Sequence, residues 1–204
     1  MSRPGKIVCI GRNYRDHAKE MGNDVPTEPL IFLKPSSSII ANGDAIRLPA
    51  QSSQVEHEGE IGVVIGRTLR RVSVQEAQEG IEGIVAANDV TARDLQRSDS
   101  QWTRAKGFDT FCPMGDVAKA PADLSGLTVV TRVNGVERQR GVASDMVFSI
   151  PDVLSFISHV MTLEPGDLVL TGSPAGVGKL LAGDEVEVEV LGVSRVRNPV
   201  TVGA

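Results

Sequence analysis

Three acidic residues at alternating positions, Glu56, Glu58 and Glu60, precede a run of β-branched residues at 63–65. A strand places residues two apart on one face, so these three carboxylates are expected to lie together. Crowded carboxylates repel one another, and a bound cation removes that repulsion. Carboxylate oxygens suit Mg²⁺, Mn²⁺ or Ca²⁺, and the sequence has no Cys and His spacing typical of a zinc site. The stretch therefore indicates a divalent metal site, although a solvated strand face carrying acids would have the same pattern.

Asp89 is the candidate for a further metal ligand. It follows a strand predicted at 81–87 and precedes a helical turn, so its side chain is expected to point into a cleft. With the glutamates it would form a three-carboxylate set that leaves coordination positions open for water or substrate. A helix N-cap is the alternative role for an aspartate at this position.

His17 and Glu20 lie three residues apart on a short helix predicted at 12–21, so they share a face of that helix. A carboxylate that orients an imidazole and stabilises its protonated form is the arrangement that a general base requires. An ordinary surface pair of His and Glu would have the same spacing. The proline-containing segment at 24–29 is a candidate hinge for this helix.

Lys106 lies in a segment rich in aromatic residues, which contains the single tryptophan of the chain, Trp102. It is a candidate for binding an anionic substrate, and the alternative is a surface lysine whose aliphatic part packs on the aromatic rings. The Gly-rich stretch at 171–178 offers backbone N–H groups and hydroxyls for an anion. It lacks the Gly-Lys-Ser/Thr ending of a P-loop.

The elements that must position these residues are mostly strands separated by tight turns, because the chain has 21 glycines, 11 prolines and few aromatic residues. Turn residues at 42–44 and 134–135 predict two β-hairpins. Ser73 and Ser149 are predicted to start helices, the first through a capping box with Glu76. Strands are predicted at 6–10, 30–33, 55–65, 81–87, 128–133, 136–139, 168–170, 185–190 and 193–197.

Length and composition limit the classes of protein to consider. A chain of 204 residues with 41% hydrophobic residues suffices for one well-packed domain, and nothing demands a boundary within 1–204. The net charge of −5 and the lack of a Lys/Arg cluster argue against nucleic acid or membrane partners. No signal peptide or membrane span is evident. Cys9 and Cys112 are too few for a disulfide framework, which favours buried, reduced thiols in a cytoplasmic protein.

Seven motifs occur in order from about residue 6 to 180. They are Gly11-Arg12-Asn13-Tyr14 with His17 and Glu20, Phe32-Leu33-Lys34-Pro35, His57-Glu58-Gly59-Glu60 followed by Gly62-Val63-Val64, Asp89-Val90-Thr91-Ala92-Arg93-Asp94 with Gln96, Lys106-Gly107-Phe108-Asp109, Phe148-Ser149-Ile150-Pro151, and Thr171-Gly172-Ser173-Pro174-Ala175-Gly176-Val177-Gly178. In this combination the chain resembles the fumarylacetoacetate hydrolase family, and within it the compact acylpyruvate hydrolase and oxaloacetate decarboxylase branch.

The resemblance implies a mixed α/β, β-rich fold, built on a rolled β-sheet with a short N-terminal lid helix and assembled as a homodimer. It implies a mobile lid segment at about 11–25 that carries the catalytic dyad of His17 and Glu20, and a Lys106 that faces the substrate. The implied ligands of Mg²⁺ or Mn²⁺, with Ca²⁺ as a substitute in crystals, are Glu58, Glu60 and Asp89, which leaves Glu56 outside the set. The residues implied in substrate binding are Arg12, Asn13, Arg93, Gln96, Thr171 and Gly172.

The implied activity is metal-dependent cleavage of the C–C bond of an acylpyruvate such as fumarylpyruvate, which gives pyruvate and a carboxylic acid. A water deprotonated by His17 would attack the distal carbonyl, while Lys106 and the metal would stabilise negative charge. The alternative on the same metal site is decarboxylation or tautomerisation of an oxaloacetate-like 2-keto acid. A catalytically silent metal-binding protein is a third hypothesis. The loop at 97–101 is shorter than the insert of many members of this branch, and it borders the implied cleft, so substrate preference is the property that it is expected to alter.

Overall fold

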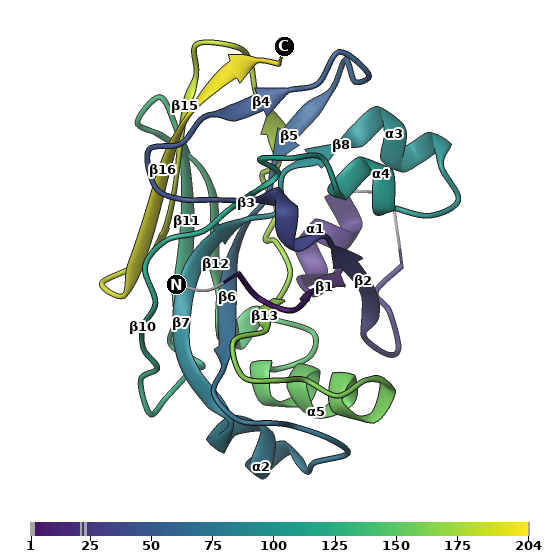
Figure 1. The fold of residues 1–204 in the computed structure, drawn as a ribbon, viewed down its shortest axis with the longest axis vertical. Helices are drawn as coiled ribbons and strands as arrows, with labels where there is room; N and C mark the ends of the chain where they lie inside the picture. The colour runs from purple at the N-terminus through teal and green to yellow at the C-terminus, as the bar shows by residue number, and fades with distance from the viewer. Residues whose placement is uncertain (1–2, 21, 23, 204) are drawn as a thin grey trace.

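The fold is β-rich and mixed α/β, as the sequence predicts, with short helices at the periphery of the sheets (Figure 1). The computed structural model describes residues 3–20, 22 and 24–203. Two large sheets, one of six strands and one of five, provide most of the framework, and two small sheets lie beside them. Within the described ranges, no helix has the length and apolar character needed to cross a membrane.

The six-stranded sheet holds the most buried strands of the molecule. In spatial order its strands are β10 (Ala118–Lys119), β7 (Ile81–Asn88), β6 (Gly59–Ile65), β13 (Leu168–Leu170), β1 (Ile7–Gly11) and β2 (Leu30–Lys34). All seven residues of β6 are buried, and Glu60 is the only charged residue among them. β1 and β13 pair in parallel, whereas the other neighbours are antiparallel. This pairing brings the N-terminal strand beside the strand that precedes the Gly-rich loop.

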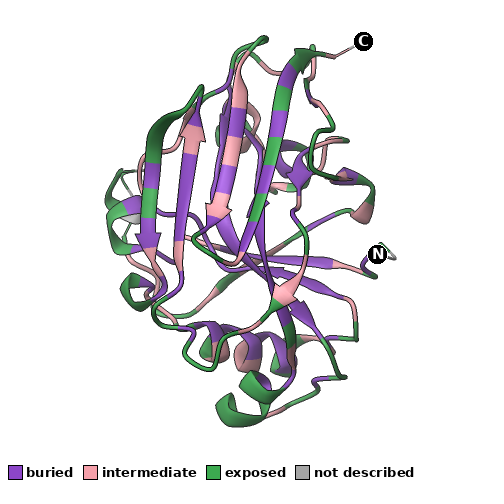
Figure 2. Ribbon diagram, turned by 90° about the vertical axis from the view of Figure 1, so that its left-hand side faces the viewer, coloured by how far each residue is buried: buried purple, intermediate pink, exposed green. Residues whose placement is uncertain are grey.

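The five-stranded sheet has one buried and one solvated face. In spatial order its strands are β12 (Val136–Val142), β11 (Thr128–Val133), β15 (Glu185–Val190), β16 (Ser194–Val202) and β4 (Ile46–Leu48). Buried and more exposed residues alternate along β15 and β16, as Figure 2 shows. Asn134 and Gly135 have φ angles of 52° and 77°, which confirms the predicted type I′ hairpin between β11 and β12.

Two predictions about strands are wrong. The acidic stretch is not one strand, because it divides at Glu58 into β5 (Val55–His57) and β6, which pair in different sheets. The turn at 42–44 does not form a hairpin, because the segments on either side of it pair elsewhere. The small sheets are β14 (Gly178–Lys179), β5 and β8 (Thr91–Ala92), and β3 (Ile39–Ile40) with β9 (Cys112–Pro113).

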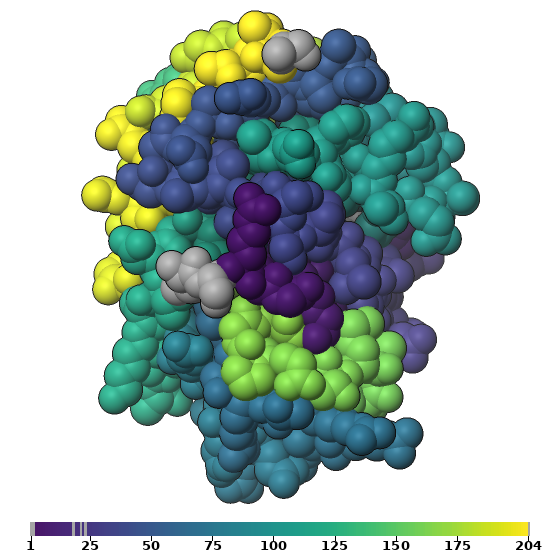
Figure 3. Space-filling model, viewed as in Figure 1, coloured from purple at the N-terminus to yellow at the C-terminus, as the bar shows by residue number. Residues whose placement is uncertain are grey.

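The helices are short and cover the ends of the large sheets. They are α1 (Arg15–Glu20), α2 (Val74–Glu79), α3 (Arg93–Ser98), α4 (Thr103–Lys106) and α5 (Ile150–Val160), with 3₁₀ turns at Ser36–Ser38 and Ala143–Asp145. The predicted capping box forms at the start of α2, and α2 packs on α5 at one end of the molecule (Figures 1 and 3). The helix predicted at 12–21 starts later, at Arg15, and its predicted last residue, Met21, lies outside the described residues.

The main core lies where α5 and strands of both large sheets meet. Val153, Leu154 and Ile157 of α5 are buried in it, whereas Val160, the last residue of the helix, is 60% exposed. Cys9 and Cys112 are buried free thiols in a second apolar cluster, as the sequence predicts. The cores thus fix β1, β6, β7 and β13, the strands that carry or flank the candidate site.

Candidate active site

Three carboxylates converge at the ends of strands in the six-stranded sheet. Each of Glu58, Glu60 and Asp89 offers an oxygen within 4.8 Å of the oxygens offered by the other two, and all three residues are buried. Glu56 is not part of this group, although strand alternation alone placed it with the other two glutamates. The division of the acidic stretch at Glu58 accounts for the difference, because alternation of faces does not continue through the break.

The break at Glu58 is held by hydrogen bonds from the neighbouring strand. The Glu58 backbone N–H donates to Asn88 Oδ1 at 2.9 Å, and the Asp89 backbone N–H donates to the Glu58 carbonyl at 2.8 Å. The next residue, Gly59, has no room for a side chain, since a Cβ there would lie 1.9 Å from Thr131 Oγ1. The segments that carry Glu58 and Asp89 are thereby fixed relative to each other and to the second sheet.

The charges within the cluster are unequally compensated. Burial and the neighbouring carboxylates of Asp89 and Glu58 raise the pKa of Glu60 well above its usual value. Burial also opposes ionisation of Glu58, but the charges of Lys106 and Arg93 more than offset it and lower its pKa. A divalent cation would relieve the repulsion around Glu60. Oxygen donors at these separations therefore fit a hard cation of the Mg²⁺, Mn²⁺ or Ca²⁺ type.

Two buried lysines face Asp89. Lys106 Nζ bonds to Asp89 Oδ2 and lies 2.8 Å from Glu58 Oε2, and it is 2% exposed, so it is not a surface lysine. Burial alone would lower the pKa of Lys106, but the two carboxylates raise it, so the ammonium form is stabilised. Lys34 Nζ lies 2.7 Å from Asp89 Oδ1 as an ion pair without hydrogen-bond geometry, and no described residue forms a hydrogen bond with that oxygen. Apart from this ion pair, Asp89 Oδ1 has no polar partner among the described residues.

The alternative role of Asp89 as a helix cap is wrong. The helix that follows, α3, begins at Arg93, and its N-cap residue is Ala92. Asp89 instead lies directly after β7, at the place where the sequence predicted a strand to end.

Arg93 is fully engaged by neighbouring side chains. Its Nε donates to Glu56 Oε2 at 2.8 Å, its Nη2 pairs with Glu58, and its Nη1 donates to Gln96 Oε1. The second oxygen of Glu56 accepts a hydrogen bond from Gln54 at 2.6 Å. Glu56 therefore anchors Arg93, and Arg93 in turn anchors Glu58.

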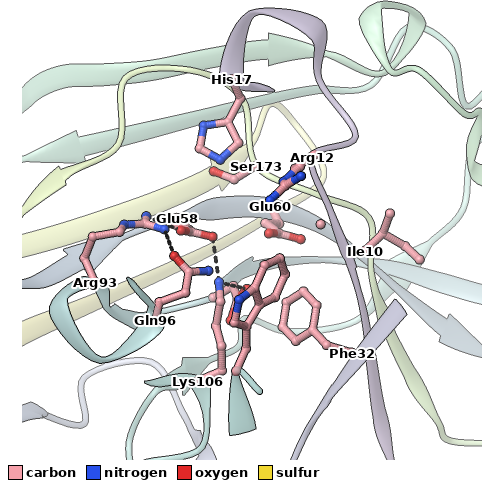
Figure 4. Close-up of a pocket in the computed structure, with 13 residues that line it drawn as sticks. Ile10, Arg12, His17, Phe32, Glu58, Glu60, Arg93, Gln96, Lys106 and Ser173 are labelled. Atoms are coloured by element: carbon pink, nitrogen blue, oxygen red, sulfur yellow. Dashed lines mark hydrogen bonds and ion pairs between the residues drawn. The ribbon is translucent and has the colours of Figure 1, made fainter. Parts of the chain in front are cut away.

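The short helix α1 lies over the cluster and is held to the Gly-rich loop. His17 Nδ1 lies 3.2 Å from Glu20 Oε2, and the backbone N–H of Gly176 is 3.1 Å from both carboxylate oxygens of Glu20. Glu20 therefore both orients the imidazole and fastens the helix to the loop. Figure 4 shows His17 on the side of the pocket opposite Lys106, with Glu58 between them.

The carboxylates, His17 and an apolar wall line a pocket with a cavity of about 70 Å³. This is small compared with the roughly 300–1,000 Å³ of common ligand pockets, so it suits a small substrate. Its lining residues are Ile10, Gly11, Arg12, His17, Phe32, Glu58, Glu60, Asp89, Arg93, Gln96, Trp102, Lys106 and Ser173.

Three of the predicted substrate-binding residues do not line this pocket. The Asn13 side chain bonds to the backbone of Phe148 and Thr171, and the Thr171 hydroxyl donates to the Ile61 carbonyl at 2.8 Å. The Gly172 N–H donates to Glu60 Oε2 at 2.7 Å. Their polar groups are used to hold the Gly-rich loop and Glu60 in place, whereas Arg12, Arg93 and Gln96 do line the pocket.

Several residues at the site had no role in the sequence-based prediction. Lys34 belongs to one of the seven motifs, but the sequence analysis assigned it no function. Its burial against Asp89 in the structure is what indicates a role at the site. Gln139 lies on β12, yet its amide links His57 and the Gly59 N–H to Ser173 and Pro174 of the Gly-rich loop. A lone glutamine within an amphipathic strand carries no sequence signal for such a link.

Comparison with known proteins identifies the family. Residues 6–201 match the model of the fumarylacetoacetate (FAA) hydrolase C-terminal domain. The chain therefore belongs to the fumarylacetoacetate hydrolase family, as the motifs predicted. It is 46% identical over 198 residues to oxaloacetate tautomerase FAHD1, mitochondrial, of Arabidopsis thaliana, covering 94% of this chain and 89% of the relative.

Two further relatives carry related names. Oxaloacetate decarboxylase, mitochondrial, of Dictyostelium discoideum is 42% identical over 195 residues, covering 92% of this chain and 89% of that protein. The crystal structure of a 5-carboxymethyl-2-hydroxymuconate delta-isomerase from Mycobacterium smegmatis superposes with a TM-score of 0.92 at 45% identity, covering 99% of this chain and 80% of that chain. The names of these three proteins describe tautomerisation, decarboxylation and isomerisation.

Proposed function

We propose that this protein is a metal-dependent enzyme that decarboxylates or tautomerises an oxaloacetate-like 2-keto acid. The observation that carries the proposal is the set of three buried carboxylates, Glu58, Glu60 and Asp89, beside the buried ammonium group of Lys106. The names of the two relatives, an oxaloacetate tautomerase and an oxaloacetate decarboxylase, support this reaction over the hydrolysis of an acylpyruvate. The three carboxylates are proposed to hold Mg²⁺ or Mn²⁺.

A divalent cation held by these carboxylates would supply Lewis-acid stabilisation for negative charge on a keto oxygen of the substrate. Lys106 stays protonated between Glu58 and Asp89, so it acts as a fixed positive charge and hydrogen-bond donor and does not act as a base. Arg93 holds Glu58 in position through its own bond to Glu56. The site is therefore preorganised for an anionic substrate.

His17 is the residue proposed to move protons. In tautomerisation, one proton leaves the enol oxygen and another is added at C3 of the substrate. In decarboxylation, the C3–C4 bond breaks, CO₂ leaves, its electron pair stays on the three-carbon fragment, and a proton is then added at C3. Glu20 Oε2, 3.2 Å from His17 Nδ1, orients the imidazole that would deliver this proton. Closure of α1 over the pocket would exclude bulk water.

Hydrolysis of an acylpyruvate is a second candidate, favoured by the pairing of His17 with Glu20 at 3.2 Å on the lid helix. This reaction needs a base to deprotonate water, whereas loss of CO₂ needs none. The two candidates therefore respond differently to removal of the imidazole.

The test measures three reactions in one purified sample with added Mg²⁺ or Mn²⁺: pyruvate formation from oxaloacetate, ketonisation of enol-oxaloacetate, and hydrolysis of fumarylpyruvate. We expect the oxaloacetate reactions to have the higher kcat/KM. His17→Ala is expected to retain CO₂ release, to slow ketonisation about 100-fold or more, and to abolish hydrolysis.

A wild-type enzyme that hydrolyses fumarylpyruvate faster than it converts oxaloacetate would reject the proposal. A His17→Ala variant with full hydrolase activity would reject the base assignment.

A further inference from the structure

Gln139 is a buried polar residue between exposed neighbours on β12. It is 1% exposed, whereas Arg138 and Arg140 on either side of it are exposed. None of the residues that line the pocket belongs to the five-stranded sheet that contains β12. A buried amide is costly unless its donors and acceptors are all used, so the partners of Gln139 indicate what it is there to hold.

All four hydrogen-bonding positions of the Gln139 amide are occupied. Its oxygen accepts from His57 Nδ1 at 2.8 Å and from the Gly59 N–H at 3.0 Å. Its nitrogen donates to Ser173 Oγ at 2.7 Å and to the Pro174 carbonyl at 2.8 Å. A backbone N–H can only donate and a carbonyl can only accept, so these partners fix which end of the amide faces which segment. A side chain with acceptors alone or without polar atoms cannot replace it.

The two ends of the amide meet the two segments that organise the site. The oxygen meets Gly59, which lies between two of the candidate metal ligands at the start of β6. The nitrogen meets the Gly-rich loop, whose Gly172 N–H donates to Glu60 Oε2 at 2.7 Å. The Gly176 N–H of the same loop is 3.1 Å from both carboxylate oxygens of Glu20. The loop therefore touches a candidate metal ligand at one end and the catalytic dyad at the other.

The loop also packs closely on β12, on both sides of Gln139. A Cβ on Gly176 would lie 2.1 Å from the Arg138 carbonyl oxygen, and a Cβ on Gly141 would lie 2.6 Å from the Pro174 Cβ. These contacts press the loop against the strand, and the bonds from Gln139 lie between them. Ser173, which accepts one of these bonds, also lines the pocket (Figure 4).

We propose that Gln139 is a positioning residue that holds the Gly-rich loop at one place against the strand of the metal ligands, and thereby keeps Glu60 and Glu20 in register with each other. A side chain from outside the pocket then sets the geometry of two groups within it. The proposal rests on the proposed function only for the activity measurement described below.

The test compares Gln139→Met and Gln139→Glu with the wild type by hydrogen exchange and mass spectrometry of the full chain with Mn²⁺ added. Methionine keeps the approximate shape and removes all four bonds, whereas glutamate keeps both acceptors and loses both donors to the loop. In both variants we expect exchange in the loop at 172–178 and in α1 to rise about 10-fold or more, because two bonds to the loop are lost. Exchange in β15 and β16 is expected to change less than about threefold.

The pH dependence of Gln139→Glu separates its two ends. A protonated carboxyl group regains one donor, so loop protection relative to the wild type should recover in part between pH 8 and pH 5. Gln139→Met has no such donor and should not recover. Recovery in neither variant would mean that the donors to the loop are not what holds it.

The activity measurement uses saturating Mn²⁺ and the two oxaloacetate reactions. Ketonisation depends on the pairing of His17 with Glu20, so its kcat is expected to fall about 10- to 100-fold in Gln139→Met, with KM changed less than about threefold. Release of CO₂, which needs no base, is expected to fall less than about threefold.

Two variants on the same sheet serve as controls. Val190→Ala removes buried methyl groups from the main core and lowers global stability, but it leaves the bonds of Gln139 intact. It should not loosen the loop selectively. Arg140→Gln changes the exposed neighbour on β12 and should leave exchange and activity unaffected.

The outcomes separate this inference from the proposed function. Wild-type protection of the loop in Gln139→Met, or the same selective loosening in Val190→Ala, would overturn the role of Gln139. If the wild type converts neither form of oxaloacetate, the proposed function fails, and the exchange measurements still decide the role of Gln139.

Discussion

At the scale of single residues, the site separates acids that look equivalent in the sequence. Glu56 gives both of its oxygens to protein donors, Arg93 and Gln54, whereas Glu60 has one backbone donor and a raised pKa. Glu58 lies between these cases, because it is held by two cations and still adjoins the other carboxylates. Proximity therefore indicates which of them a metal would use, because Glu58, Glu60 and Asp89 bring oxygens within 4.8 Å of one another and Glu56 is not in that group.

This difference predicts unequal effects of removing each acid. Glu58→Ala and Glu60→Ala are expected to weaken Mn²⁺ binding at least 100-fold, because each removes an oxygen from the three-carboxylate set. Glu56→Ala is expected to weaken Mn²⁺ binding about 10-fold or less, since it acts only through Arg93. Calorimetric titration with Mn²⁺ measures all three variants. Equal losses in Glu56→Ala and Glu58→Ala would mean that the ligand set is wrongly assigned.

At the scale of elements, the site depends on the close contact between β6 and β11. Gly59 starts β6, and a Cβ at this position would collide with Thr131 Oγ1 and lie 3.1 Å from a Val188 methyl group. The Thr131 hydroxyl is buried and forms no hydrogen bond with any described residue, so the contact is one of packing. The junction between the two sheets thus sets the position of the neighbouring candidate ligand, Glu58.

Gly59→Ala is therefore expected to destabilise the protein by about 2–3 kcal/mol, the magnitude of overpacking in a core, and to weaken metal binding as well. Adding Thr131→Ala should recover part of the stability, because it removes the atom that the new methyl group would meet. Gly126→Ala is the control, since a Cβ there has only Asp123 at 4.0 Å. Urea unfolding measures all of these variants. Similar stabilities for Gly59→Ala and Gly126→Ala would contradict the packing argument.

At the scale of the whole molecule, metal binding and folding should be linked. Glu58 and Glu60 lie at the start of β6 and Asp89 follows the end of β7, so the three carboxylates meet only when these two strands have paired. A ligand that binds only the folded state stabilises it by about 2.7 kcal/mol at 100 times its Kd. For a chain of this length that corresponds to a rise in Tm of roughly 5–10 °C.

The expected result is a Tm that rises with Mg²⁺ or Mn²⁺ and returns to its starting value on addition of a chelator. Differential scanning calorimetry measures this shift. The Glu60→Gln variant serves as the control and should show a much smaller rise. A wild-type Tm that does not change over millimolar Mn²⁺ would argue against a metal site in the native fold.

Local sequence signals predicted the elements that depend on nearby residues. The Ser73–Glu76 capping box and the Asn134-Gly135 turn form as expected, because their hydrogen bonds and φ angles involve residues within one turn of the chain. The alternation in β15 and β16 likewise follows from contact with a single buried face. The hairpin at 42–44 failed as a prediction, because the flanking segments gain more partners in distant strands than in each other.

By itself the sequence determined the family, the β-rich fold class and the identity of the candidate metal ligands, since these depend on residue types in a fixed order. Only the tertiary structure decided which charges are already paired. In the structure, Lys34 is buried against Asp89, and Arg93 joins Glu56 to Glu58. Arg12 has no protein partner in the part of the chain that the structure describes. Pairing of charges depends on contacts between segments far apart in sequence, and no local pattern encodes those contacts.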